Sequence, residues 1–236
     1  MTRKRINILF LLIVIALPAY VQDGNYISLK QKTELLEKNK KITSSLELYF
    51  DKSRTTLTKY IRVPEEVITV TNRLGEIKIY YPSTNQVAYM QGNQFSAQRS
   101  TLYYFTNNQT DHLGLADEGF TLVSRNYEGQ FLVAMWKSPA GSGVIDQVKM
   151  VFEGANPIYS EYINTKGIVL KKVFYTQYHD YYSFRMPLRI TEISFHPTGD
   201  SIINRTIFSD VSVTIAPSSD YFNFKIPDDA QTIKKE

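Results

Sequence analysis

The chain has 236 residues, a formal net charge of +4 and a hydrophobic content of 43%, and it contains no cysteine. The absence of cysteine excludes disulfides, thiol catalysis, cysteine-ligated metals and a lipid-modified cysteine. The net charge gives no argument for a nucleic-acid partner, which requires a dense basic patch, and we expect none.

The first residues follow the three-part plan of a secretory signal peptide. Arg3–Arg5 form a basic start, and Ile6–Leu17 is apolar except for Asn7. Pro18 breaks a helix, and Ala19 is small enough for a cleavage site. The apolar run is shorter than the about 20 residues that a transmembrane helix needs. We therefore predict that residues 1–19 are a signal peptide.

Removal of residues 1–19 leaves a single domain, residues 20–236, which is an ordinary size for a β-rich domain. The removed part carries three basic and no acidic residues, so the net charge of +4 falls to +1. A chain that begins at Gln22 and an uncleaved N-terminal anchor are the alternatives. An exported chain without cysteine favours a bacterial periplasm as the location.

The segment Tyr26–Ile42 is the strongest helix candidate. Ser28 fits an N-cap, and Leu29, Leu35 and Leu36 keep roughly to one side of a helix. Lysine and glutamate cover the remaining surface of the segment. We predict a helix here whose lysine-rich side faces solvent.

Three short β-type runs follow one another in Ile68–Met90. Within each run, side chains alternate with a period of two, which places successive residues on opposite faces of a strand. Turn-forming residues separate the runs at Asn72–Gly75 and Pro82–Asn85. The pattern predicts an antiparallel meander in which one face is more apolar than the other. This apolar face packs against either a closed core or a cavity for an apolar guest.

The residues between Gly92 and Gly119 lack the strand pattern of the preceding stretch. Ser100–Phe105 and His112–Ala116 carry apolar residues without clean alternation, and Gly114 fits a stop signal. This pattern predicts one or two short helices or a covering loop.

Strand patterns occupy most of the remaining chain. They predict strands at Ser44–Phe50, Leu57–Val63, Phe120–Arg125, Gln130–Trp136, Asp146–Phe152, Tyr159–Ile163, Ile168–Tyr175, Leu188–Phe195 and Ser201–Thr214. From these runs we predict about ten or eleven strands and one to three helices, without β-α-β alternation. The fold class is therefore α+β and mainly antiparallel β, with one curled sheet and helices against one side.

Five stretches share features with one known family. Gly75 followed by Ile77–Pro82 and Gln86-Val87 forms a hairpin pattern that ends in Tyr-Pro. The other stretches are Leu113–Tyr127, Lys137–Pro139, Met186–Ile190 and Phe222–Pro227. Together they resemble the LolA-type periplasmic carriers of outer-membrane lipoproteins over most of residues 28–230.

The resemblance implies a half-open curled β-barrel covered by short helices, with an apolar cavity for acyl chains. It also implies an arginine that helps to hold and release the cargo. Only Arg62, next to Val63-Pro64, corresponds to that arginine. The chain between the predicted first helix and Gly75 is more compact than in the family.

No catalytic motif emerges from the sequence. G-x-S-x-G, H-E-x-x-H and glycine-rich phosphate loops are absent. His112, His179 and His196 are far apart in the sequence and are expected at the surface. We expect a protein that is not an enzyme and has neither a metal nor another cofactor.

The aromatic content is the strongest functional signal, with 17 tyrosines and 13 phenylalanines. Strands favour aromatics in any case. The functional interpretation is a sheet that encloses more space than its own side chains fill, where each buried CH₂ of an acyl chain contributes roughly 0.8 kcal/mol. The predicted cavity residues are Ile68, Val70, Ile77, Ile79, Tyr81, Val87, Tyr89, Phe131, Val133, Met135, Val148, Met150 and Phe152. The predicted lid residues are Leu102, Phe105, Leu113 and Leu115.

Two functions fit these patterns. The first is a monomeric periplasmic carrier of acylated lipoproteins or other lipids, which would work with envelope membrane machinery. The second is an accessory or structural subunit that binds an envelope protein or glycolipid and carries nothing. A continuous apolar pocket favours the carrier, and an interior filled by the chain's own tyrosines favours the accessory role.

Overall fold

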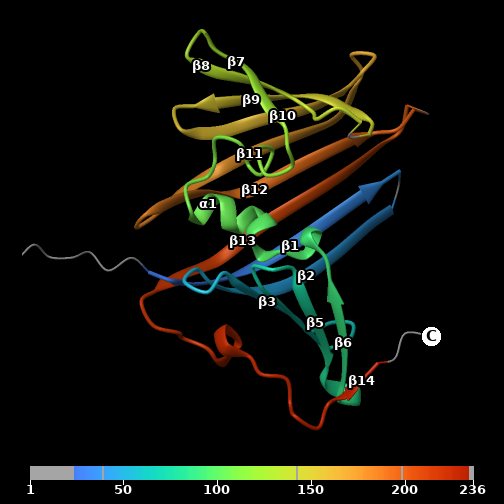
Figure 1. The fold of residues 1–236 in the computed structure, drawn as a ribbon, viewed down its shortest axis with the longest axis vertical. Coiled ribbons are helices and arrows are strands. Elements are labelled where there is room, and N and C mark those ends of the chain that lie inside the picture. Colours follow the sequence, from blue (N-terminus) through green and yellow to red (C-terminus); the bar gives the residue numbers. More distant parts are fainter. Residues whose placement is uncertain (1–23, 39, 142, 198, 234–236) are drawn as a thin grey trace, which may run out of the picture.

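The computed structural model describes residues 24–38, 40–141, 143–197 and 199–233. In this part of the chain, 14 strands form one sheet that curls around a short helix and stays unclosed (Figure 1). The predicted signal peptide lies outside the described residues. None of the helices in the described ranges is long and apolar enough to cross a membrane.

The strands form two antiparallel meanders. The first contains β1 (Tyr26–Glu37), β2 (Lys40–Asp51), β3 (Thr56–Ile61), β4 (Val67–Thr71), β5 (Glu76–Tyr81) and β6 (Gln86–Gln91). The second contains β7 (Thr121–Glu128), β8 (Phe131–Lys137), β9 (Ile145–Glu153), β10 (Asn156–Asn164), β11 (Val169–Tyr181), β12 (Phe184–Phe195) and β13 (Ser201–Thr214). The short β14 (Gln231–Thr232) runs parallel to β6.

The two meanders meet where β1 pairs with β13. The strand order is therefore β14-β6-β5-β4-β3-β2-β1-β13-β12-β11-β10-β9-β8-β7. As a result, β6 and β7 lie towards opposite ends of the sheet although they follow each other in the sequence. Residues 92–120, here called the covering segment, connect them across the face that we call the inner face (Figure 1).

The covering segment contains the 3₁₀ turns Asn93–Phe95 and Ala97–Arg99 and the helix α1 (Thr101–Thr106). Ser100 caps α1, since its hydroxyl accepts a hydrogen bond of 3.1 Å from the backbone N–H of Tyr103. A helix of six residues is not stable by itself. Its packing against the inner face therefore holds α1 in place.

The last part of the chain, residues 215–233, crosses the opposite face, which we call the outer face (Figure 1). This C-terminal segment contains a 3₁₀ turn, Asp220–Asn223. The ring of Tyr221 stacks on Tyr49 and Tyr60 with centroid distances of 5.0 and 4.8 Å. The segment thus covers the apolar outer side of β2–β6.

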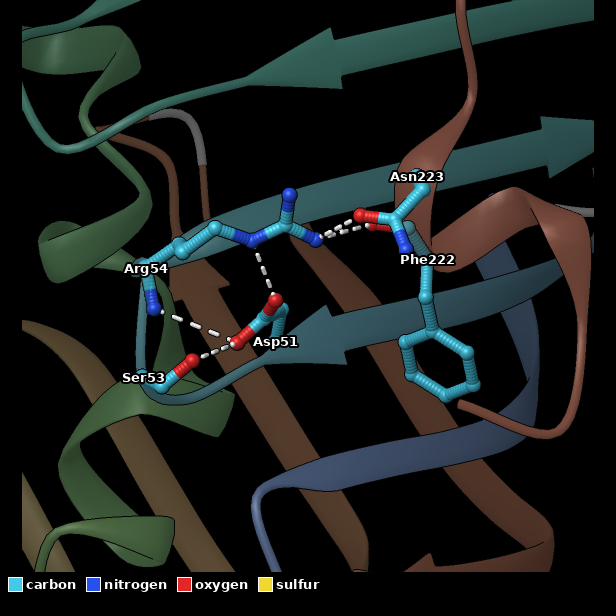
Figure 2. Close-up of polar contacts among 5 residues, drawn as sticks. All are labelled: Asp51, Ser53, Arg54, Phe222 and Asn223. Carbon is cyan, nitrogen blue, oxygen red and sulfur yellow. Dashed lines mark hydrogen bonds and ion pairs between the residues drawn. The ribbon is translucent and has the colours of Figure 1, made fainter. Parts of the chain in front are cut away.

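Polar contacts fix this segment to the turn between β2 and β3 (Figure 2). Asp51 is fully buried and accepts hydrogen bonds from Ser53 Oγ at 2.6 Å and from the backbone N–H and Nε of Arg54. Burial acts to raise the pKa of Asp51, but these donors outweigh it and hold the pKa below its usual value. The Arg54 guanidinium also donates to the carbonyl of Phe222 at 3.0 Å and to the Asn223 side chain.

The helix predicted at Tyr26–Ile42 is wrong, because this stretch forms β1 and the start of β2. Every residue of β1 has a partner in β2, and most have one in β13. These ladders outweigh the modest helix preference of lysine, glutamate and leucine. Lys30 and Lys32 then lie on one exposed side of a strand rather than along a helix.

The mainly antiparallel fold class is confirmed, but three details differ. The described chain contains 14 strands rather than ten or eleven, and the covering elements are one short α-helix and 3₁₀ turns. Strand β11 also continues to Tyr181, beyond the predicted end at Tyr175. The sheet is curled and unclosed, so it is not a closed barrel.

Arg54→Ala should release the C-terminal segment from the outer face. Hydrogen bonds to charged groups contribute about 1.5–3 kcal/mol, so the segment should open about tenfold more often or more. Limited trypsin digestion at Lys225 measures this opening. Arg73→Ala, at an exposed turn, is the matched control and should leave the cleavage rate unchanged. Equal rates for Arg54→Ala and the unaltered protein would contradict the anchoring role of Arg54.

Candidate functional site

A partly open cavity of about 410 Å³ lies between the covering segment and the inner face. Its walls come from β1–β3 of the first meander and β10–β13 of the second, so it spans the junction of the two meanders. Its apolar lining consists of Leu48, Leu57, Leu102, Leu113, Val173, Ile190 and Phe208. Its polar lining consists of Gln31, Lys59, Arg99, Ser100, Thr101, Tyr104, Tyr162, Lys171, Tyr175, Glu192 and Thr206.

Two apolar clusters on the inner face border the cavity. Leu102 and the fully buried Phe105 fill the central cluster with residues of β1–β3 and β11–β13. Leu115 packs into a second cluster on β8 and β9. Leu113 and Tyr162 contact both clusters and also line the cavity, which places it at the boundary between them.

Buried tyrosines supply neutral hydroxyl groups to the cavity. The hydroxyl of Tyr175 lies 3.4 Å from Ser160 Oγ. Burial raises the pKa of Tyr175 strongly and the pKa of Tyr162 to about 12. Both side chains therefore stay uncharged at neutral pH and can donate hydrogen bonds to a guest.

Positive charges outnumber negative ones in the lining, with three cations and one carboxylate. Lys171 Nζ lies 3.9 Å from Glu192 Oε2 and 4.0 Å from the ring centroid of Tyr162. Arg99 Nη1 lies 3.9 Å from Glu118 Oε1. Within the described ranges, Lys59 forms neither an ion pair nor a side-chain hydrogen bond, so the cavity wall presents a free cation.

The residues predicted on the meander Ile68–Met90 divide between the two faces. Ile68, Val70 and Val87 lie on the outer face, where they pack against the C-terminal segment. Tyr89 points to the same side, since it follows Val87 at a spacing of two, and its side chain is exposed.

The other predicted residues of the meander lie on the inner face, because they alternate with the outward-facing Tyr80. These residues are Ile77, Ile79 and Tyr81. None of these predicted residues lines the cavity.

The residues predicted on β8 and β9 also divide between faces. Val148, Met150 and Phe152 pack in the second inner cluster. On β8, the inner-face residues are Leu132, Ala134 and Trp136. The predicted Phe131, Val133 and Met135 therefore point to the other face, because alternation separates them from their neighbours. Again, none of the predicted residues lines the cavity.

The four predicted lid residues all lie in the covering segment over the inner face. Leu102 and Leu113 line the cavity, whereas Phe105 and Leu115 fill the clusters beside it. Their role in a moving lid stays a prediction.

The predicted cargo arginine, Arg62, lies away from the cavity. Its side chain is exposed and its guanidinium carbon lies 5.6 Å from the ring centroid of the outward-facing Tyr60. On the neighbouring strand β3, Lys59 lines the cavity instead. The alternation of Leu57, Lys59 and Ile61 places these three side chains on one face, and this signal in the sequence could have identified Lys59.

The three histidines do not come together in the structure. His112 lies in the covering segment, where its Nδ1 accepts a hydrogen bond of 3.1 Å from the backbone of Gly114. His179 and His196 are exposed at other places. Groups of side chains suited to a metal ion are absent from the described ranges.

Phe105→Ala should destabilise the protein by about 3–5 kcal/mol, because a large, fully buried side chain of the covering segment is replaced by a cavity. Tyr127→Ala on the exposed edge strand β7 is the control, with a change within about 0.5 kcal/mol. Urea unfolding measures both. Equal stability of the two variants would contradict the packing role of α1.

Comparison with known proteins gives a likeness of fold. Neither a family model nor a curated protein sequence matches the chain. A LolA superfamily protein from Nitrosomonas europaea has a TM-score of 0.55 at 13% identity, with 86% of this chain and 91% of that chain covered. A putative outer membrane lipoprotein-sorting protein domain from Vibrio parahaemolyticus has a TM-score of 0.54 at 14% identity, with 84% and 90% covered.

A DUF1329 family protein from Desulfovibrio piger is similar to the same degree, with a TM-score of 0.54, 15% identity and coverage of 84% of this chain and 90% of that chain. These identities are low, and the likeness extends over most of each chain. The chain therefore has the fold of the LolA superfamily.

Proposed function

We propose that this chain is a periplasmic carrier that binds the acyl chains of lipoproteins, or of other lipids, in the cavity beneath the covering segment. The observation that carries the proposal is the cavity itself, which lies between an apolar sheet face and a separate segment of the chain. The similar fold of a putative outer membrane lipoprotein-sorting protein domain supports it.

The energies involved suit a carrier that must also release its cargo. The apolar contacts of the covering segment come from a few large side chains, chiefly Leu102, Phe105 and Leu115. Burial of each contributes about 1.5–3 kcal/mol. An acyl chain that buries several CH₂ groups gains a similar amount, at roughly 0.8 kcal/mol each. Closed and loaded states of similar stability allow both uptake and release.

The size of the cavity limits what it holds while closed. A volume of about 410 Å³ lies at the small end of the range of ligand pockets, which is roughly 300–1,000 Å³. A cargo with several acyl chains would therefore require the covering segment to move outward. A guest with a single chain is the simplest occupant of the closed form.

The accessory role remains the second candidate, and one observation favours it. Tyr104, Tyr162 and Tyr175 occupy part of the interior with the protein's own side chains. If the covering segment does not move, this interior is a core with a small void. The protein would then bind an envelope partner through its surface.

The cellular setting is part of the proposal. The basic and apolar start of the chain is typical of an exported protein, and the absence of cysteine fits a bacterial periplasm. In this setting a monomeric carrier would receive cargo from one membrane and deliver it to the outer membrane through envelope machinery. No catalytic step is needed for this task.

Leu113→Asp should weaken the binding of a fluorescent fatty acid by about tenfold or more, since it places a charge in the apolar wall. Leu113 has a positive φ of 44°, which aspartate tolerates better than most residues. Fluorescence titration of the purified protein measures the affinity, and circular dichroism confirms that the sheet is folded.

The matched control is Leu122→Asp on the exposed edge strand β7, which should bind the fatty acid as the unaltered protein does. Failure of the unaltered protein to bind the fatty acid would overturn the carrier proposal in favour of the accessory role. Equal affinities of both variants would place the binding site elsewhere.

A further inference from the structure

Lys59 is set into an apolar wall of the cavity. It lies on β3 between Leu57 and Ile61 on the inner face, and its cross-strand neighbour on β2 is Leu48. Leu48, Leu57 and Lys59 all line the cavity. A cationic group therefore stands beside the surface that would hold an acyl chain.

The charge of Lys59 lacks a partner within the part of the chain that the structure describes. Two other strand lysines have a partner, since Lys30 Nζ lies 2.9 Å from Asp210 Oδ2 and Lys137 Nζ lies 2.5 Å from Asp146 Oδ1. The carboxylate in the cavity lining, Glu192, pairs with Lys171. Lys59 is thus the cation of the cavity that is available to a guest.

Burial makes this unpaired charge costly. The side chain is half-buried, and desolvation lowers the pKa of Lys59 without an opposing contribution from a carboxylate. A partly desolvated ammonium is stabilised strongly by an anion at hydrogen-bond distance, because the low local dielectric strengthens the attraction. The cavity wall around Lys59 therefore favours a negatively charged group.

We infer that the ligand of the cavity is an anionic amphiphile, whose carboxylate or phosphate headgroup binds Lys59 while its hydrocarbon chain lies against Leu48, Leu57 and Val173. This inference rests on the proposed binding of an acyl chain and names the headgroup that accompanies it. The other two cations of the lining, Arg99 and Lys171, face Glu118 and Glu192 at 3.9 Å. The positive charge of Lys59 therefore favours an anion over a neutral or cationic headgroup.

Calorimetric titration with dodecanoate and with the neutral dodecanamide tests this inference on the full exported chain. The unaltered protein should bind dodecanoate about 10- to 100-fold more tightly than dodecanamide, as expected for a charged hydrogen bond. Lys59→Met should lose this preference while its affinity for dodecanamide is kept. Lys59→Arg should retain the preference, because it retains the charge.

Two controls separate the role of Lys59 from general effects. Lys78→Met removes an exposed lysine on the outer side of β5 and should leave both affinities unchanged. Lys59→Met without ligand should have a higher melting temperature than the unaltered protein, because a desolvated charge is removed. A lower melting temperature would show that the ammonium is already stabilised in the free protein, which overturns the inference.

The possible results separate a failure of the anionic headgroup from a failure of acyl binding itself. If the unaltered protein binds both probes equally and Lys59→Met does the same, the anionic headgroup is refuted while acyl binding stands. If neither probe binds the unaltered protein, the proposed function itself fails. If inorganic phosphate alone competes with dodecanoate at a similar concentration, the cavity is an anion site and the amphiphile is refuted.

Discussion

The pairing of β1 with β13 determines which segment of the chain covers the inner face of the sheet. It joins the two meanders at their first and last strands and so sends β6 and β7 towards opposite ends of the sheet. The chain that connects β6 to β7 must then cross the inner face. Since that crossing is made by a short helix and turns rather than by a second sheet, it covers the face incompletely and leaves the cavity.

Both faces of the sheet carry apolar side chains, and two segments cover them by different means. The C-terminal segment is fixed to the outer face by stacked rings and by the contacts of Arg54 with Asp51 and Phe222. The covering segment is held over the inner face by apolar contacts of α1 and of Leu115 and by hydrogen bonds on either side of α1, such as that from the Asn108 side chain to the carbonyl of Ser183 at 2.8 Å. Apolar contacts lack directional partners, so a hydrophobic guest can replace them.

The sequence predicts the bounds of an element correctly where its pattern depends only on neighbouring residues. Strand β13 has the predicted bounds Ser201–Thr214, because alternation and turn residues define it locally. The error at Tyr26–Ile42 arose because pairing with β2 and β13 is not visible in the local sequence. Alternation also cannot say which face of a strand is the inner one, and so Met135 was predicted in place of Trp136. Alternation places Lys59 on the same face as Leu57 and Ile61, but a charge within an apolar strand pattern does not by itself indicate a cavity residue.

The proposed function requires that the space between the inner face and the covering segment holds an acylated guest in the cell. Native mass spectrometry of the protein purified from its host without detergent tests this most directly, with a denaturing spectrum of the same sample as the reference. The account predicts an added mass of a lipid or lipoprotein that is present in the native spectrum and lost on denaturation. A native spectrum that contains only the bare chain, from protein that also fails to take up added fatty acid, would contradict it.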